Sequence, residues 1–195
     1  MVNDCDTIRA IAETLKKYQE SFQYLIIDPV MVSTSGCRLM QEDALDVFIT
    51  ELLPLATLLT PNIPEAEILA GMKIENAEDI KAAAAAICKL GCRYVLIKGG
   101  HFDGAEKVDY LFEDGKQKTS YRGISVNTRN THGTGCTLSS AITSYLAREM
   151  DMNTAIAMAK TYLSGAILAG KDIKIGEGHG PVNHFYEPKS LFTKS

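Results

Sequence analysis

Short runs that are apolar at every position alternate along this chain with stretches in which apolar side chains recur every three or four residues. The second pattern predicts amphipathic helices and first appears over residues 4–18. The continuous apolar runs cover residues 24–30, 56–60 and 94–97. Parallel strands covered by helices on both faces show such runs, whereas strands with one wet face alternate. We therefore predict three buried strands in a parallel sheet.

Further helices are predicted between and after these strands, over residues 42–53, from Pro64 to Gly71, from Asn76 to about Gly91, and over residues 137–148 and 153–169. Pro64 suits a first helical turn, and Gly71 is a typical helix stop. Asn76 is a typical N-cap, with Asp79 three residues later. The stop and start signals therefore agree with the periodicity.

Residues 108–126 change the pattern, because apolar and polar positions alternate there around Asp114-Gly115, which indicates a β-hairpin. Helices that alternate with buried strands are typical of a doubly wound α/β fold. We expect a single domain over residues 1–195, with a mainly parallel sheet flanked by helices and the hairpin before the last helices. Ligands of such sheets bind beyond the carboxyl ends of the strands.

Composition narrows the functions that fit. The chain has 195 residues, of which 46% are hydrophobic, and an ordinary globular balance. Its net charge is −4 and no Lys/Arg cluster stands out, which argues against nonspecific binding of nucleic acid. No apolar run reaches the roughly 20 residues of a membrane span. The first residues lack the order of a secretory signal, so we expect a cytoplasmic protein.

Cysteine and histidine spacing argues against a disulfide framework and a structural zinc site. The chain has 5 cysteines, without paired CxxC spacing, and 4 histidines without the spacing of metal ligands on a helix. The simplest interpretation of Cys88 and Cys92 is reduced, mostly buried thiols.

The strongest candidate for chemistry is Thr131-His132-Gly133-Thr134-Gly135-Cys136-Thr137, here called the anion loop, which precedes a helix of small residues. Its glycines allow a tight turn that brings N–H groups together, and the helix adds its free N–H groups and positive dipole end. These features form a site for an anion such as phosphate. Cys136 falls in the first turn, where the dipole favours a thiolate. The competing interpretation is a glycine turn that caps a helix, with Cys136 in the core.

Two lysines are further candidates for anion binding. Lys98 follows a buried strand and precedes two glycines, at the sheet edge where ligands bind. The alternative for Lys98 is a solvated side chain. Lys160 lies in the middle of an apolar helix, where the alternative is a side chain that reaches solvent along its aliphatic stem.

Oxygen-bearing side chains follow two of the predicted strands. Asn62 and Glu65 are three residues apart across a helix start, so they can face one point, and Asp28 follows the neighbouring strand. Carboxylates from two strand ends suit Mg²⁺, which is held by a few carboxylates with waters and substrate phosphates. Helix capping by Asn62 and Glu65, and a strand-ending turn at Asp28-Pro29, are the competing interpretations.

These motifs together resemble the hydroxymethylpyrimidine kinase branch of the ribokinase-like superfamily. They are Asp28-Pro29-Val30-Met31, Ser35-Gly36, Thr60-Pro61-Asn62, Glu65-Ala66, Lys98-Gly99-Gly100-His101, the anion loop and Gly178-His179-Gly180-Pro181-Val182-Asn183-His184. They come in the family's order along essentially the whole chain. Cys136 is specific to this resemblance, because the sugar-kinase branches usually carry Asp there, whereas some pyridoxal kinases also carry Cys.

The resemblance implies ATP-dependent phosphorylation of 4-amino-5-hydroxymethyl-2-methylpyrimidine and of its monophosphate, in thiamine biosynthesis. It also implies a cytoplasmic enzyme, expected as a homodimer, that uses ATP and Mg²⁺. The implied roles are an anion hole at Gly133, Thr134, Gly135 and Cys136, catalysis by Cys136, Lys98 and Lys160, ATP contacts from Asn62, Mg²⁺ ligation by Asp28 and Glu65, and a pyrimidine contact from Val30. Phosphoryl transfer requires such donors, cations and a base.

The sequence departs from the family in one respect. Met1-Val2 aligns with an internal family position, so the chain is expected to be the C-terminal, ATP-binding portion of the domain and to lack full activity alone. The alternatives are a pyridoxal or pyridoxine kinase and a catalytically silent nucleotide-binding module.

Overall fold

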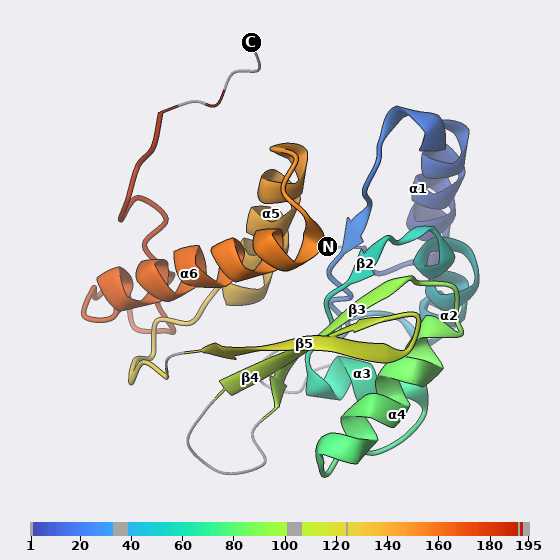
Figure 1. Ribbon diagram of the computed structural model, residues 1–195, viewed down its shortest axis with the longest axis horizontal. Helices are drawn as coiled ribbons and strands as arrows, with labels where there is room; N and C mark the ends of the chain where they lie inside the picture. Colours follow the sequence, from blue (N-terminus) through green and yellow to red (C-terminus); the bar gives the residue numbers. More distant parts are fainter. Residues whose placement is uncertain (1, 33–38, 101–106, 124, 191, 193–195) are drawn as a thin grey trace. The chain divides into compact units, whose positions relative to one another are not determined.

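The computed structural model describes residues 2–32, 39–100, 107–123, 125–190 and 192 (Figure 1). The motif residues Ser35, Gly36 and His101 lie outside this set. The chain divides into two compact units, Met1–Arg122 and Gly123–Ser195. The first unit contains nearly all of the sheet, and the second contains the anion loop.

A five-stranded sheet organises the first unit, in the order β1-β2-β3-β4-β5. Its strands are β1 (Ile26–Ile27), β2 (Leu58–Leu59), β3 (Tyr94–Gly100), β4 (Lys107–Glu113) and β5 (Lys116–Gly123). The β1–β2 and β2–β3 pairs are parallel, whereas β3 and β4 are antiparallel. The predicted α/β class and parallel strands are confirmed, and the hairpin makes the sheet a mixed one.

The hairpin forms around the turn that the sequence predicts. Asp114 and Gly115 link β4 to β5, and both have positive φ, 49° and 76°. Two successive residues with positive φ suit the right-handed twist of a tight hairpin, and Asp-Gly tolerates that conformation.

The central strands are buried on both faces, as the continuous apolar runs predict. Leu58 and Leu59 of β2 are fully buried, and so are Val95, Leu96 and Ile97 of β3. The prediction is wrong for β1, whose two residues are only half-buried. Among the described strands β1 pairs only with β2, so it lies at the edge of the sheet.

In the described part of the first unit the α-helices are α1 (Cys5–Lys17), α2 (Glu42–Val47), α3 (Ile63–Ala70) and α4 (Ala77–Cys88). The predicted helix over 42–53 is less regular than expected, because α2 continues as a π-helical segment, Phe48–Leu52, and a 3-10 turn, Leu53–Leu55. Gly71 ends α3 with φ 64°, and the Asn76 side chain accepts from the N–H groups of Glu78 and Asp79. The local capping signals were therefore correct.

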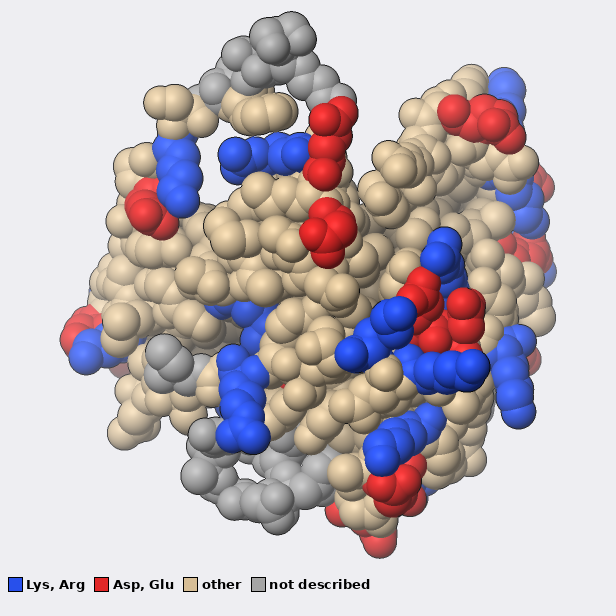
Figure 2. Space-filling model, viewed as in Figure 1, with Lys and Arg blue, Asp and Glu red and all other residues tan. Residues whose placement is uncertain are grey.

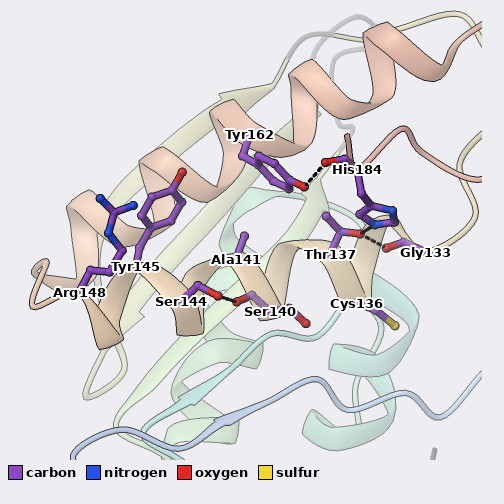
Figure 3. A pocket seen from close by; sticks show the side chains of 10 residues that line it. All are labelled: Gly133, Cys136, Thr137, Ser140, Ala141, Ser144, Tyr145, Arg148, Tyr162 and His184. Atoms are coloured by element: carbon purple, nitrogen blue, oxygen red, sulfur yellow. Dashed lines mark hydrogen bonds between the residues drawn. The ribbon is translucent and has the colours of Figure 1, made fainter. Parts of the chain in front are cut away.

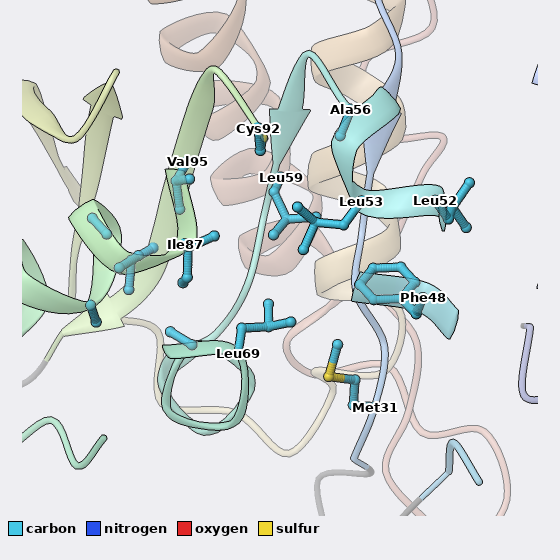
Figure 4. Close-up of a cluster of buried hydrophobic side chains, with 14 of the residues drawn as sticks. Met31, Phe48, Leu52, Leu53, Ala56, Leu59, Leu69, Ile87, Cys92 and Val95 are labelled. Atoms are coloured by element: carbon cyan, nitrogen blue, oxygen red, sulfur yellow. The ribbon is translucent and has the colours of Figure 1, made fainter. Parts of the chain in front are cut away.

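The core of the first unit lies between the helices and one face of the sheet (Figure 4). Leu53, Leu59, Ile87 of α4 and Val95 of β3 all belong to this cluster. Each of these side chains has no exposed surface. Replacing such a buried Leu with Ala typically destabilises a protein by about 2–5 kcal/mol, so this layer holds the strand ends in place.

The second unit is built on α5 (Thr134–Ala147) and α6 (Met152–Gly170), which pack against each other. Their buried residues include Leu138 and Ile142 on α5 and Ile156 on α6. Asp151 caps α6 by accepting from the N–H groups of Asn153 and Thr154. In the described part of the chain, no helix is long and apolar enough to cross a membrane.

Candidate functional site

Polar side chains from neighbouring strand ends meet in the first unit, as the parallel order predicts. Lys98 Nζ lies 2.9 Å from Asp28 Oδ1, and Thr60 donates its hydroxyl to the same oxygen at 3.1 Å. Asp28 follows β1, Thr60 follows β2 and Lys98 belongs to β3. The Lys98 side chain is only 15% exposed, so the alternative of a solvated lysine is wrong.

Asn62 and Glu65 form a reciprocal capping box at the start of α3. Glu65 N donates to Asn62 Oδ1 at 2.9 Å, and Asn62 N donates to Glu65 Oε2 at 2.8 Å. An isolated parallel bridge pairs Asn62 with Lys98, because Lys98 N donates to Pro61 O. The capping interpretation is therefore confirmed, and the same box places Asn62 beside Lys98.

Burial has the largest effect on the pKa of Glu65, an acidic residue whose side chain lies in the interior. The residue is 3% exposed. Desolvation raises the pKa of its carboxyl, while the hydrogen bond from Asn62 N–H and the positive charge of Lys98 act in the opposite direction. The negative charge of Asp28 adds to the increase. Two carboxyl groups thus compete for one lysine.

The carboxylates of the first unit fit a magnesium ion that takes only some of its ligands from the protein. Among the described residues, no group of three or more His, Cys, Asp or Glu side chains could hold a metal. Asp28 and Glu65 provide two carboxylates near one lysine. Because Mg²⁺ commonly binds one or two carboxylates together with waters and substrate phosphates, this pair fits the ion in a nucleotide complex.

An irregularity in the β3–β4 ladder lies beside Lys98, and the acid that bonds to it, Asp109, was not predicted from the sequence. The β3–β4 register shifts between Ile97 and Gly100, and Gly99 has φ 78°. The buried Asp109 accepts from Gly99 N at 2.7 Å. Bulges often redirect a side chain beside a functional site. Asp109 lies two residues before the buried Leu111, so an acid on the apolar face of a strand was the available signal.

The anion loop of the second unit has the geometry that its glycines predict. Gly133 is the N-cap of α5 in the left-handed conformation, with φ 82°. Thr137 N donates to Gly133 O at 2.9 Å, the first bond of the helix, so Gly135 and Cys136 lie in the turn ahead of it. The N–H groups of a first turn lack intrahelical acceptors and attract anions. α5 begins at Thr134, earlier than the predicted position 137.

Cys136 is exposed in this first turn, so the interpretation that places it in the core is wrong. The free thiols of Cys88 and Cys92 differ from it, since Cys88 is half-buried and Cys92 is buried. Burial raises the pKa of Cys92 to about 12. The prediction of reduced, mostly buried thiols is therefore confirmed for Cys92, and Cys88 is a free thiol that is only partly buried. Cys136 is the accessible sulfur of the loop.

Thr137 links the loop to the C-terminal motif, a connection absent from the sequence analysis. Its hydroxyl donates to Gly133 O at 2.7 Å and lies 3.0 Å from His184 Nε2. Because that hydroxyl hydrogen is directed at Gly133, the ring nitrogen acts as the donor to Thr137. Tyr162 of α6 in turn donates to His184 O at 3.0 Å. Figure 3 shows the Thr137 hydroxyl directed toward Gly133 and His184.

A cavity of about 500 Å³ lies along this side of α5 (Figure 3). Its lining runs from the anion loop to the end of the helix and consists of Gly133, Cys136, Thr137, Ser140, Ala141, Ser144, Tyr145, Arg148, Tyr162 and His184. The volume lies within the range of small-molecule sites. The cavity therefore runs from the anion loop along a surface lined by hydroxyl and aromatic side chains and by Arg148.

The remaining predicted residues are placed as follows. Lys160 lies in the middle of α6, half-buried, next in the chain to the fully buried Ala159. Val30 is half-buried and follows Asp28, to whose carbonyl its N–H donates. Acidic and basic side chains are interspersed on the face drawn in Figure 2.

Comparison with known proteins places these features in context. A family model described as phosphomethylpyrimidine kinase matches residues 1–183. A hydroxymethylpyrimidine/phosphomethylpyrimidine kinase from Rhizobium meliloti (strain 1021) is 44% identical over 187 residues, covering 95% of this chain and 69% of the relative. The thiamine biosynthesis bifunctional protein ThiED of Geobacter sulfurreducens is 44% identical over 184 residues, or 94% of this chain and 36% of that protein.

Solved structures agree in fold. A phosphomethylpyrimidine kinase from Clostridium difficile 630 superposes with a TM-score of 0.73 at 44% identity, covering 86% of this chain and 66% of that one. A Bacillus subtilis pyridoxal kinase in an ADP complex gives a TM-score of 0.80 at 33% identity, over 94% and 67% of the two chains. The chain thus spans about two thirds of the length of these kinases.

Proposed function

Because the chain belongs to the phosphomethylpyrimidine kinase family, we propose that it transfers the terminal phosphoryl group of ATP to hydroxymethylpyrimidine and then to the resulting monophosphate. The substrate hydroxyl attacks the γ-phosphorus, ADP leaves, and the hydroxyl proton passes to a base. The second transfer gives the diphosphate. The family match over residues 1–183 is the observation that carries the proposal.

Cys136 is the base in this proposal, and the anion loop binds the transferring phosphate. The exposed position of Cys136 in the first turn of α5 supports its role, because a base must be open to the substrate. Gly133, Thr134 and Gly135 shape the turn whose N–H groups neutralise charge as it develops. Lys160, half-buried on α6, is proposed as a second phosphate contact.

Nucleotide and metal roles fall to the strand ends of the first unit. Staphylococcus aureus pyridoxal kinase, of which this chain is a 32% identical neighbour, has been solved with ADP. In our proposal Asn62 contacts the nucleotide, Lys98 its phosphates, and Asp28 and Glu65 hold Mg²⁺. When bound there, the ion would neutralise negative charge on the nucleotide phosphates. Val30 is assigned to the pyrimidine.

Pyridoxal phosphorylation is the second candidate function. The observation that favours it is structural, since the Bacillus subtilis pyridoxal kinase gives a TM-score of 0.80 and the Clostridium difficile phosphomethylpyrimidine kinase 0.73. Identity favours the pyrimidine, at 44% against 33%. We weigh identity more heavily, because side chains select the substrate whereas the backbone is shared.

A coupled assay of ADP release separates the candidates. The purified chain is given ATP and Mg²⁺ with hydroxymethylpyrimidine, its monophosphate or pyridoxal, and kcat/KM is compared. The proposal expects the highest kcat/KM with the two pyrimidines. Higher values with pyridoxal would favour the second candidate. Nucleotide binding without substrate-dependent ADP release would favour a silent nucleotide-binding module.

Location and assembly belong to the same proposal. We assign the protein to the cytoplasm and to a homodimer, as the resemblance implies. Light scattering of the purified chain at several concentrations tests the dimer, and a monomer at every concentration would exclude it.

A further inference from the structure

Asn130, which directly precedes the anion loop, has a buried side chain that no role above uses. It is 8% exposed. Its Nδ2 donates to Ile173 O at 2.6 Å and to Gly170 O at 2.7 Å, and Lys171 O lies at 3.5 Å. Three backbone carbonyls thus converge on one amide nitrogen.

These carbonyls belong to the end of α6 and the residues just after it. The last carbonyls of a helix have no intrahelical donor and need another partner when they are buried. An amide carries two N–H donors, so Asn130 satisfies Gly170 and Ile173 at once. A carboxylate of the same size has no donor and would bring negative charge to the negative end of the helix dipole.

The oxygen of the same amide holds the C-terminal motif. Gly180 N donates to Asn130 Oδ1 at 3.2 Å. A Cβ at position 180 would collide with Asn130 Oδ1 and lie 2.7 Å from its Cγ, so the contact requires glycine. Gly180 belongs to the C-terminal motif, and this contact gives that glycine a structural role.

Gly180 in turn is hydrogen-bonded to the anion loop. His132 N donates to Gly180 O at 3.1 Å, and an isolated bridge pairs His132 with Pro181. Thr128 strengthens the connection, because its hydroxyl donates to Lys171 O at 2.9 Å and accepts from Asn130 N at 3.0 Å. The end of α6, the C-terminal motif and the start of the loop are therefore tied through one side chain.

We propose that Asn130 is the positioning residue of the anion loop, which it holds in phosphate-binding geometry through Gly180 and His132 without itself contacting the ligand. The inference rests on the proposed nucleotide-binding function. Its physical reason is alignment, since a donor displaced by about 1 Å loses much of its value, roughly 10²-fold in rate in comparable cases.

The test compares two substitutions with the same chemistry. Asn130→Asp preserves size and the acceptor for Gly180 but removes both donors. Asn127→Asp makes the same change at an exposed position three residues upstream. Calorimetry on the full chain measures the affinity for AMP-PCP, a non-hydrolysable ATP analogue, and for adenosine, which lacks phosphates. Thermal unfolding confirms that each variant is folded.

The expected result is a loss of AMP-PCP affinity of roughly tenfold or more in Asn130→Asp, as for misaligned donors, with adenosine affinity unchanged. Asn127→Asp should match the unmodified chain for both ligands. Equal AMP-PCP affinity in folded Asn130→Asp would overturn the positioning role, and so would an equal loss for adenosine. An unmodified chain that binds neither ligand would refute the proposed function and this role with it.

A milder variant covers the case in which Asn130→Asp does not fold. Thr128→Val removes one hydroxyl that supports Asn130 and Lys171 and introduces no charge. A loss of AMP-PCP affinity in the same direction, about threefold for one supporting hydrogen bond, agrees with the proposal. Unchanged affinity in this variant would contradict it.

Discussion

The ammonium nitrogen of Lys98 lies 2.9 Å from Asp28 Oδ1, and the two side chains are 15% and 14% exposed. Opposite charges that are mostly removed from water depend on each other, because either one alone would be left poorly solvated. The ion pair joins the residue that follows β1 to β3, near the carboxyl ends of these parallel strands. It therefore has consequences for stability as well as for ligand binding.

Lys98→Met is expected to lower the free energy of unfolding by about 3 kcal/mol, because it leaves Asp28 without its cation. Urea unfolding measures the change. The double variant Asp28→Asn with Lys98→Met should recover much of this stability without recovering kinase activity. Recovery of stability alone would separate the structural contribution of the pair from its proposed catalytic one.

Lys81→Met provides the control for this experiment. Lys81 pairs with Glu78 at 2.7 Å, but the two side chains are 48% and 79% exposed. Exposed pairs contribute less than about 1 kcal/mol, so this variant should unfold nearly as the unmodified chain does. Equal losses in Lys81→Met and Lys98→Met would show that burial of the Asp28–Lys98 pair has no special effect.

The raised pKa of Glu65 is expected to make the free energy of unfolding depend on pH. Burial raises the pKa of its carboxyl above the value of 4.5. The folded state therefore retains the proton more strongly than the unfolded state, and stability falls as pH rises from about 4.5 through the raised pKa. Glu65→Gln removes this titration. Unfolding free energies should thus decline with pH in the unmodified chain relative to Glu65→Gln, and parallel curves would contradict the expectation.

The proposed metal role of Glu65 has a separate readout. Glu65→Gln retains an oxygen that can accept from Asn62 N but has no charge to attract Mg²⁺. We expect Mg²⁺ to raise the affinity for AMP-PCP in the unmodified chain. In the variant, the factor by which Mg²⁺ raises this affinity should be smaller by roughly tenfold or more, as for a lost charged ligand. An undiminished effect of Mg²⁺ would limit Glu65 to the capping box.

Glu113 is expected to make stability depend on pH in the opposite direction. Hydrogen bonds from Tyr94, Lys118 and Arg93 lower the pKa of this carboxyl to about 2. Its stabilising effect is complete above the usual pKa of 4.5 and is lost as pH falls toward about 2. Glu113→Gln should therefore be less stable than the unmodified chain at neutral pH, and the difference should shrink below pH 4.5. A difference that is constant from neutral to acid pH would exclude this mechanism.

Local sequence signals predicted much of the fold, the helix ends in particular. Asn76 with Asp79 and the stop at Gly71 act within one helical turn, so the sequence places these helix ends well. The ends of the strands were less well predicted, because an apolar run also includes residues just outside the hydrogen-bonded part of the strand. β1 has two residues where the run has seven, over 24–30. Pairing partners decide where a strand ends, and they are not visible locally.

The site was predictable where strand order alone brings residues together, as for Asp28 and Lys98, 70 positions apart. It was not predictable where a specific loop path is needed. Thr137 and His184 are 47 positions apart, and Asn130 and Gly180 are 50 apart, and no periodicity pairs them. Asp109 stood out in the sequence only as an acid on the apolar face of a strand, and its partner, Gly99 N–H, is set by an irregularity of the ladder that the sequence does not reveal.

Cys136→Ala tests the proposed base directly. Turnover should fall by roughly 10²-fold or more, as for the loss of a general base, measured by coupled ADP release in an enzyme form that turns over. AMP-PCP affinity should change little, because in the proposed mechanism the loop would bind phosphate through backbone N–H groups, which alanine retains. Cys5→Ala, at a half-buried thiol on α1, is the control and should retain full turnover. Near-normal turnover in Cys136→Ala would assign the proton to another acceptor, whereas a parallel loss of AMP-PCP affinity would indicate that the side chain shapes the loop instead.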